Sequence, residues 1–89
     1  MFVDPFESAS DSLVTPARDC FPVAASDTAD LPQATKAIYI GTGGDITLRT
    51  VAGEQDVVFR NVVSGSILDV RVKAIRATGT DASDIVGLA

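Results

Sequence analysis

The chain has 89 residues, enough for one small domain, and a formal net charge of −5 at pH 7. A domain of this size buries roughly 60% of the surface that its unfolded chain exposes, so we expect contacts with other chains to add stability. The acidic balance argues against general binding of DNA or RNA, because neutralising phosphates requires a surplus of Lys and Arg.

Residue types that many reactive sites require are absent or scarce. The sequence has no histidine, and Cys20 is its single cysteine, so it cannot form an intramolecular disulfide and a structural zinc site is not expected. Without a histidine base, cysteine and serine nucleophiles lack their usual partner. We therefore expect a non-enzymatic protein with no catalytic residues, no cofactor and no metal, kept in a reducing compartment.

The first third of the chain differs in composition from the rest. Residues 1–33 are rich in Asp, Ser and Ala and contain four prolines, which exclude a long helix. Neither a basic segment nor a long apolar run stands at the start, so we expect no signal peptide and no membrane insertion. We predict an extended arm and linker over residues 1–33, in which Phe2, Phe6 and Phe21 are spaced like anchors that contact a partner.

From residue 34 onward, apolar and polar residues alternate between glycine-containing turns, as is typical of antiparallel strands. Strands are predicted at 37–40, 46–51, 56–60, 67–76 and 85–88, with a sixth over 21–26 left open. The glycine cluster at 41–45 is predicted to close a hairpin, and a break in alternation near Ala74 and Ile75 indicates a bulge or a change of sheet. The sequence thus predicts an all-β domain over residues 34–89, a small antiparallel sandwich or barrel of jelly-roll-like form.

The strand at 37–40 is apolar at every position, Tyr39 included. Such a strand is buried on both faces or lies at a contact between subunits. We predict that Tyr39 contributes to a partner contact.

Three groups of residues suggest chemistry but favour a structural interpretation. The glycines at 41–45 lack the helix that follows a phosphate loop, and Asp45 places a carboxylate where a phosphate would bind. Asp81 and Asp84 could offer oxygens to calcium, but their spacing matches no calcium loop, so a solvated loop is favoured. A possible positive stripe faces Asp45, Asp56 and Asp69, so pairing across strands is favoured over polyanion binding; its members are Arg49, Arg60, Arg71, Lys73 and Arg76.

Several blocks of sequence occur in an order that resembles a known family. They are PQATKAIYIGTGGD at 32–45, FRNVVSG at 59–65, VRV at 70–72 and RATGTDASDIVGL at 76–88. Together they resemble the head spike base proteins of gene transfer agents and related phage-derived particles, over Pro16 to the C-terminus.

This resemblance implies a structural virion protein at the capsid vertices, assembled in the bacterial cytoplasm and exposed on the particle. Five-fold vertices imply a pentamer, with the major capsid protein and a spike fibre as its other partners. The family has no known catalytic residues, so the resemblance transfers none. Gly41, Gly43 and Gly44 are carried over only as turn positions.

Two other functions remain open from the sequence. A tail or baseplate subunit would rest on the same physical features. A carbohydrate-binding β-sandwich module would need an exposed aromatic platform, and the sequence has no tryptophan, while Tyr39 lies in an apolar strand.

Overall fold

The structure is a computed structural model that describes residues 16–89. These residues form seven short strands and no helix. The strands are β1 (Cys20–Pro22), β2 (Ala37–Thr42), β3 (Gly44–Thr50), β4 (Val57–Val62), β5 (Ser66–Leu68), β6 (Val72–Arg76) and β7 (Ser83–Leu88).

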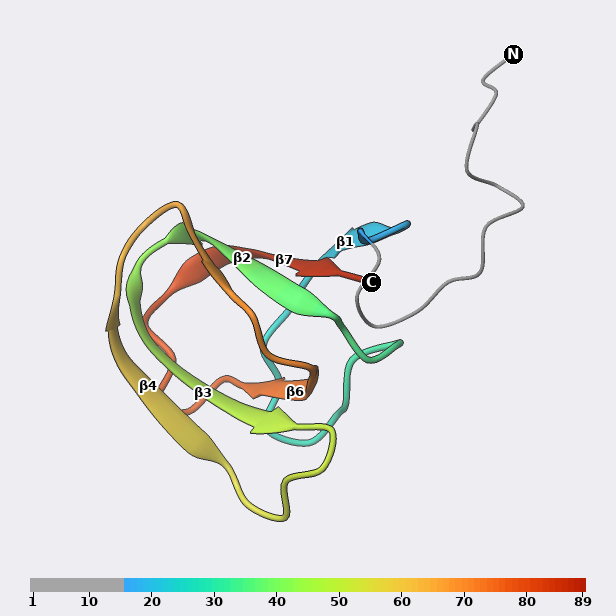
Figure 1. Cartoon of the computed structure of the whole chain (residues 1–89). Coiled ribbons are helices and arrows are strands. Elements are labelled where there is room, and N and C mark those ends of the chain that lie inside the picture. Colours follow the sequence, from blue (N-terminus) through green and yellow to red (C-terminus); the bar gives the residue numbers. More distant parts are fainter. Residues whose placement is uncertain (1–15) are drawn as a thin grey trace.

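The strands form two antiparallel sheets that enclose one core. Sheet A has the order β1-β7-β2-β5, and sheet B has the order β4-β3-β6. Figure 1 shows the two sheets as two layers on opposite sides of a common interior. The prediction of an all-β antiparallel sandwich or barrel-like domain is confirmed.

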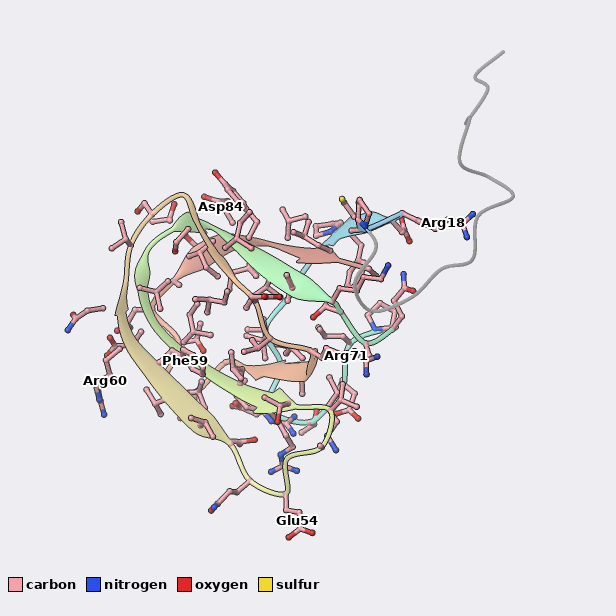
Figure 2. All side chains as sticks on the ribbon, viewed as in Figure 1. Arg18, Glu54, Phe59, Arg60, Arg71 and Asp84 are labelled. Atoms are coloured by element: carbon pink, nitrogen blue, oxygen red, sulfur yellow. The ribbon has the colours of Figure 1, made fainter. Side chains whose placement is uncertain are left out.

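Alternation along the strands determines which side chains enter the core. Ile38 and Ile40 of β2 face Ile46 and Leu48 of β3 across the interior, and all four side chains are fully buried. Figure 2 shows the same alternation on β4, where Phe59 points toward the interior and Arg60 points away from it. Burial of these aliphatic side chains is the main stabilising contribution to the fold.

The prediction of a hairpin at the glycine cluster was wrong. β2 belongs to sheet A and β3 to sheet B, and Gly43 is the single residue between them, at a corner where the chain changes sheet. The backbone of residues 62–64 crosses there so closely that a Cβ on Gly43 would lie 2.2 Å from the Val62 carbonyl oxygen. The glycine is needed for this close approach of two backbones and not for a chain reversal.

The predicted turn at 52–55 is confirmed, because it joins β3 to β4 in an antiparallel pair. The long strand predicted at 67–76 is instead two strands, β5 in sheet A and β6 in sheet B. The sheet change therefore falls at 69–71, earlier than predicted. The predicted bulge is present beside Ala74: Arg49 pairs with Ala74 and Thr50 with Val72, which leaves Lys73 as the extra residue.

The segment predicted to be a linker is bonded to the edge of sheet B. The amides of Ser26, Leu31 and Thr35 donate to carbonyls of β6 at 2.9, 2.8 and 3.1 Å. This arrangement covers an edge strand that would otherwise expose unpaired backbone groups. Because β1 also pairs with β7, residues before position 34 take part in the folded unit; the first 15 residues of the predicted arm lie outside the described residues.

Thr35 contributes to the contact between the segment at 26–35 and the edge strand β6, and this contribution can be measured. Its side chain is fully buried, and its Oγ1 accepts a hydrogen bond from the Val72 amide at 3.1 Å. Thr35→Val keeps the shape but leaves that amide unpaired, so we expect a loss of about 1–3 kcal/mol in the free energy of unfolding. Urea denaturation measures the loss, and Thr35→Ser, which retains the hydroxyl, should lose clearly less.

Candidate interaction surface

The face of sheet A that points away from the core is apolar on all four strands. Pro22 pairs with Val86, Val86 with Tyr39 and Tyr39 with Ile67, so these four residues form one row across the sheet. Directly paired residues of neighbouring strands point to the same face. Since the neighbouring positions Ile38 and Ile40 point into the core, this row points outward.

A second row lies beside the first, formed by Cys20, Leu88 and Ala37. We call the two rows together the outer face. Ile67 is 60% exposed and Tyr39 is 38% exposed, and Cys20 is a free, exposed thiol. The described residues include no element that covers this face, so it presents contiguous apolar surface of the kind that marks an interaction site.

Charged residues stand at the two ends of sheet A. Figure 2 shows Asp84 at one end, near the corner, and Arg18 at the other, just before β1. The Asp84 carboxylate accepts a hydrogen bond from the Thr42 hydroxyl at 3.0 Å. The outer face is therefore an apolar band with polar groups at its limits, an arrangement that favours contact with another apolar segment.

Of the four residues predicted to contact partners, the structure describes two. Tyr39 lies in the centre of the outer face. Phe21 instead pairs with Gly87 on the opposite face of sheet A, and its ring lies directly on that glycine, where a Cβ would be 2.6 Å from the Phe21 Cζ atom. Phe2 and Phe6 lie outside the described residues. The structure thus places Tyr39 and Phe21 on different faces.

Local sequence patterns do not single out Ile67, Val86 or Pro22 as members of one surface. They are separated along the chain and meet only through the strand order β1-β7-β2-β5. The available signal was the uniformly apolar strand at 37–40, which indicated that its second face was also apolar. Identifying the partners of Tyr39 required the register between strands.

Asp45, the last residue of the glycine cluster, makes hydrogen bonds and an ion pair at the corner where the chain changes sheet. One carboxylate oxygen of Asp45 accepts from the Asn61 amide at 3.0 Å, and the other pairs with Arg60 at 3.2 Å. The Asp45 carbonyl accepts from the amides of Asp81 and Ala82. These groups already bind one another, which supports the structural interpretation of the cluster.

The loop that was weighed as a calcium site is also bonded to the rest of the fold. The Thr80 hydroxyl accepts from the Thr47 amide at 2.9 Å, and the Thr78 hydroxyl donates to Asp27 at 2.7 Å. Within residues 16–89 there is no group of three or more His, Cys, Asp or Glu side chains that could hold a metal ion. The oxygens of this loop connect strands and segments instead.

Asp27 makes a testable contribution to acid stability. The Thr78 amide, at 2.8 Å, and then the Thr78 hydroxyl hold the pKa of Asp27 below its usual value of 3.8. A lowered pKa in the folded state means that this stabilisation is present above about pH 4 and is lost as the pH falls through the folded-state pKa. We expect Asp27→Asn to lower the melting temperature at pH 7 and to weaken its decline in acid.

Thermal denaturation from about pH 7 to about pH 2.5 measures this difference between the two proteins. Asp30→Asn is a matched control on the same segment. If Asp27→Asn melted like the parent at pH 7 and declined as steeply in acid, the contribution of this carboxylate would be refuted.

The positive stripe considered from the sequence is largely neutralised. Arg49 and Arg76 both pair with Asp56, at 2.9 and 3.4 Å, and Arg60 pairs with Asp45. Three of the five cations thus face carboxylates across strands. The structure supports a mixed-charge face on sheet B over a polyanion-binding stripe.

No family model matches the chain, and no curated protein matches it. Among solved structures, the chain is similar to one described as "Capsid of native GTA particle computed with C5 symmetry", with 36% sequence identity and a TM-score of 0.86. The match covers 98% of this chain and 100% of that one.

The chain belongs to the same family as this gene transfer agent capsid chain. Identity at this level over nearly the whole of both chains supports more than a shared fold, and it makes the chain a structural virion protein of a gene transfer agent. The likeness to gene transfer agent proteins inferred from the sequence blocks is confirmed at this level. Within residues 16–89, no helix is long and apolar enough to cross a membrane.

Proposed function

We propose that this family member is the base of a head spike, seated in a ring of five copies at the capsid vertices. In this role it connects the major capsid protein to a spike fibre. The observation that carries the proposal is the match to a chain of a capsid reconstructed with C5 symmetry, because it spans nearly all of both chains. The order of sequence blocks shared with head spike base proteins agrees with this role.

The form of the domain is suited to such a position. It is a small two-sheet sandwich whose outer face is apolar while sheet B carries paired charges. A small domain with one apolar side gains stability when neighbours cover that side. Multiple weak contacts around a ring would then give firm seating, because each contact raises the effective concentration of the next.

The mass of the purified protein tests the ring. We expect sedimentation velocity or light scattering to detect an oligomer of five copies at high concentration, alone or with the capsid protein. The same preparation should bind particles that lack this chain. A strictly monomeric species that also failed to bind such particles would contradict the proposal.

Residues 1–13 are proposed to contribute to seating on the particle more than to folding. A variant that lacks them should keep the melting temperature of the parent to within a few degrees, because the two described sheets are complete without them. Its binding to particles should fall strongly in a co-sedimentation assay. Loss of the folded sheets on this deletion would refute the assignment of the segment as an attachment arm.

A further inference from the structure

The chain enters the fold at the rim of the outer face. The amides of Arg18 and Asp19 donate to the carbonyl oxygen of Ala89 at 2.6 and 2.8 Å, and the Lys36 ammonium donates to the Pro16 carbonyl at 3.3 Å. These contacts hold residues 16–19 against the end of β7 and the start of β2. The second apolar row, from Cys20 to Ala37, begins directly beside them.

The segment before Pro16 has the length and composition to cover that face. Its fifteen residues, MFVDPFESASDSLVT, include the apolar residues Phe2, Val3, Phe6, Leu13 and Val14. Fifteen extended residues span up to roughly 50 Å. Four strands are only roughly 15 Å across, so both phenylalanines can reach the row that contains Tyr39 and Ile67.

We propose that, in the free protein, residues 1–15 lie across the outer face of their own chain, with Phe2 and Phe6 on the row that contains Tyr39 and Ile67. This inference goes beyond the proposed function, because it concerns the protein before it meets the particle. The segment then shields apolar surface that would otherwise be exposed to water and to other copies.

Two observations favour this location over other surfaces. The opposite face of sheet A is filled by the core, with Ile38 and Ile40 fully buried. Sheet B also exposes Val57 and Val58 of β4, but its outward side carries the ion pairs of Arg49, Arg76 and Arg60, which phenylalanine side chains would desolvate without compensation. Attachment at Pro16 also gives the segment a high effective concentration at the adjacent face, which favours the same chain over a neighbour in dilute solution.

The outer face contains two natural probes. Tyr39 is the only tyrosine in a chain without tryptophan, and Cys20 is the only cysteine. Acrylamide quenching of tyrosine fluorescence therefore reports on the centre of the face, and the rate of thiol modification reports on its edge. Both are measured on the full chain and on a Phe2→Ser/Phe6→Ser variant, with Asp4→Asn/Glu7→Gln as the matched control.

We expect quenching of Tyr39 and modification of Cys20 to be at least roughly twofold faster in the Phe2→Ser/Phe6→Ser variant than in the parent. This is the change expected when the segment covers the face more than half of the time. The control variant should behave like the parent, and circular dichroism should show the same β-sheet content in all three proteins. Ile67→Ser, which alters the receiving face, should also speed quenching.

Two results would overturn the inference. One is equal quenching and modification in the parent and the Phe2→Ser/Phe6→Ser variant. The other is protection that disappears on about a hundredfold dilution, since mass action removes contacts between copies but not within a chain. Both are measured on free protein, so they are independent of whether the protein occupies a capsid vertex.

Discussion

Gly43→Ala is expected to remove about 3 kcal/mol or more from the free energy of unfolding. The new Cβ would lie 2.2 Å from the Val62 carbonyl oxygen and 2.7 Å from the Ser64 amide nitrogen. Both atoms belong to the backbone, so no side-chain rotation can relieve the overlap. The corner that joins the two sheets must open, and a domain of this size is stable by only about 5–10 kcal/mol.

Gly65→Ala is the matched control within the same corner. Gly65 has a φ of 82°, but no atom lies within 4 Å of a Cβ placed there. Its replacement costs the backbone strain of a left-handed residue alone, about 1–2 kcal/mol. Thermal and urea denaturation of both variants measure the difference, and equal melting temperatures would show that the crossing at Gly43 is not a close backbone contact in solution.

Ile40→Ala is expected to lower the free energy of unfolding by about 2–5 kcal/mol, the usual effect of a cavity in a packed core. Ile40 is fully buried, pairs with Ile85 across sheet A, and is the last inward-pointing residue of β2 before the corner. Both sheets pack against this position, so neither can relax alone to fill the space. Urea denaturation gives the loss directly.

Ile67→Ala serves as the control for Ile40→Ala. Ile67 is also an isoleucine in sheet A but is 60% exposed, so its truncation should change stability by about 0.5 kcal/mol. A similarly large loss for both variants would mean that Ile67 is packed as tightly as Ile40, and the distinction between the core face and the outer face of sheet A would fail.

Much of the fold follows from local pattern, and the errors have one physical source. A continuous apolar run predicted the strand at 37–40, alternation predicted the strand at 56–60, and a glycine predicted the turn at 52–55. Each of these signals depends only on neighbouring residues. The prediction of a hairpin at the glycine cluster was wrong because three glycines and an aspartate suit a chain reversal and a close crossing of two backbones equally well. Only the position of residues 62–64, far along the chain, distinguishes them.

The split of the long strand has a similar explanation. Leu68, Val70 and Val72 alternate in phase and pack against the core, so the pattern continues across the change of sheet. When a chain passes from one sheet of a sandwich to the other, its inward-pointing side chains continue to face the same core. Alternation therefore predicts the buried residues correctly while hiding the boundary between β5 and β6.

The sequence predicted one residue of the outer face of sheet A but not the residues that lie beside it. Tyr39 was identified because its strand is apolar at every position, but Ile67 and Val86 depend on which strands lie beside β2. Phe21 was grouped with Tyr39 as a partner contact, whereas the structure places it over Gly87 on the other face. Face and register come from tertiary pairing, which a single sequence expresses weakly.

Together these features describe a small sandwich that presents one apolar face for contact. A segment that covers this face in the free protein would limit unwanted association, and its release on the particle would expose both Tyr39 and the phenylalanines to new partners. Such an exchange lets one apolar surface serve two states, provided that the partner binds it more favourably than the segment does.

Electron cryomicroscopy of particles that contain this chain tests its assignment to the capsid vertex most directly. A local reconstruction of the five-fold vertices should show density for this sandwich in five copies, between the capsid protein and the spike fibre, and particles made without the gene should lack that density. Vertices that are unchanged without the gene, or density for the chain only in the tail or baseplate, would contradict the account.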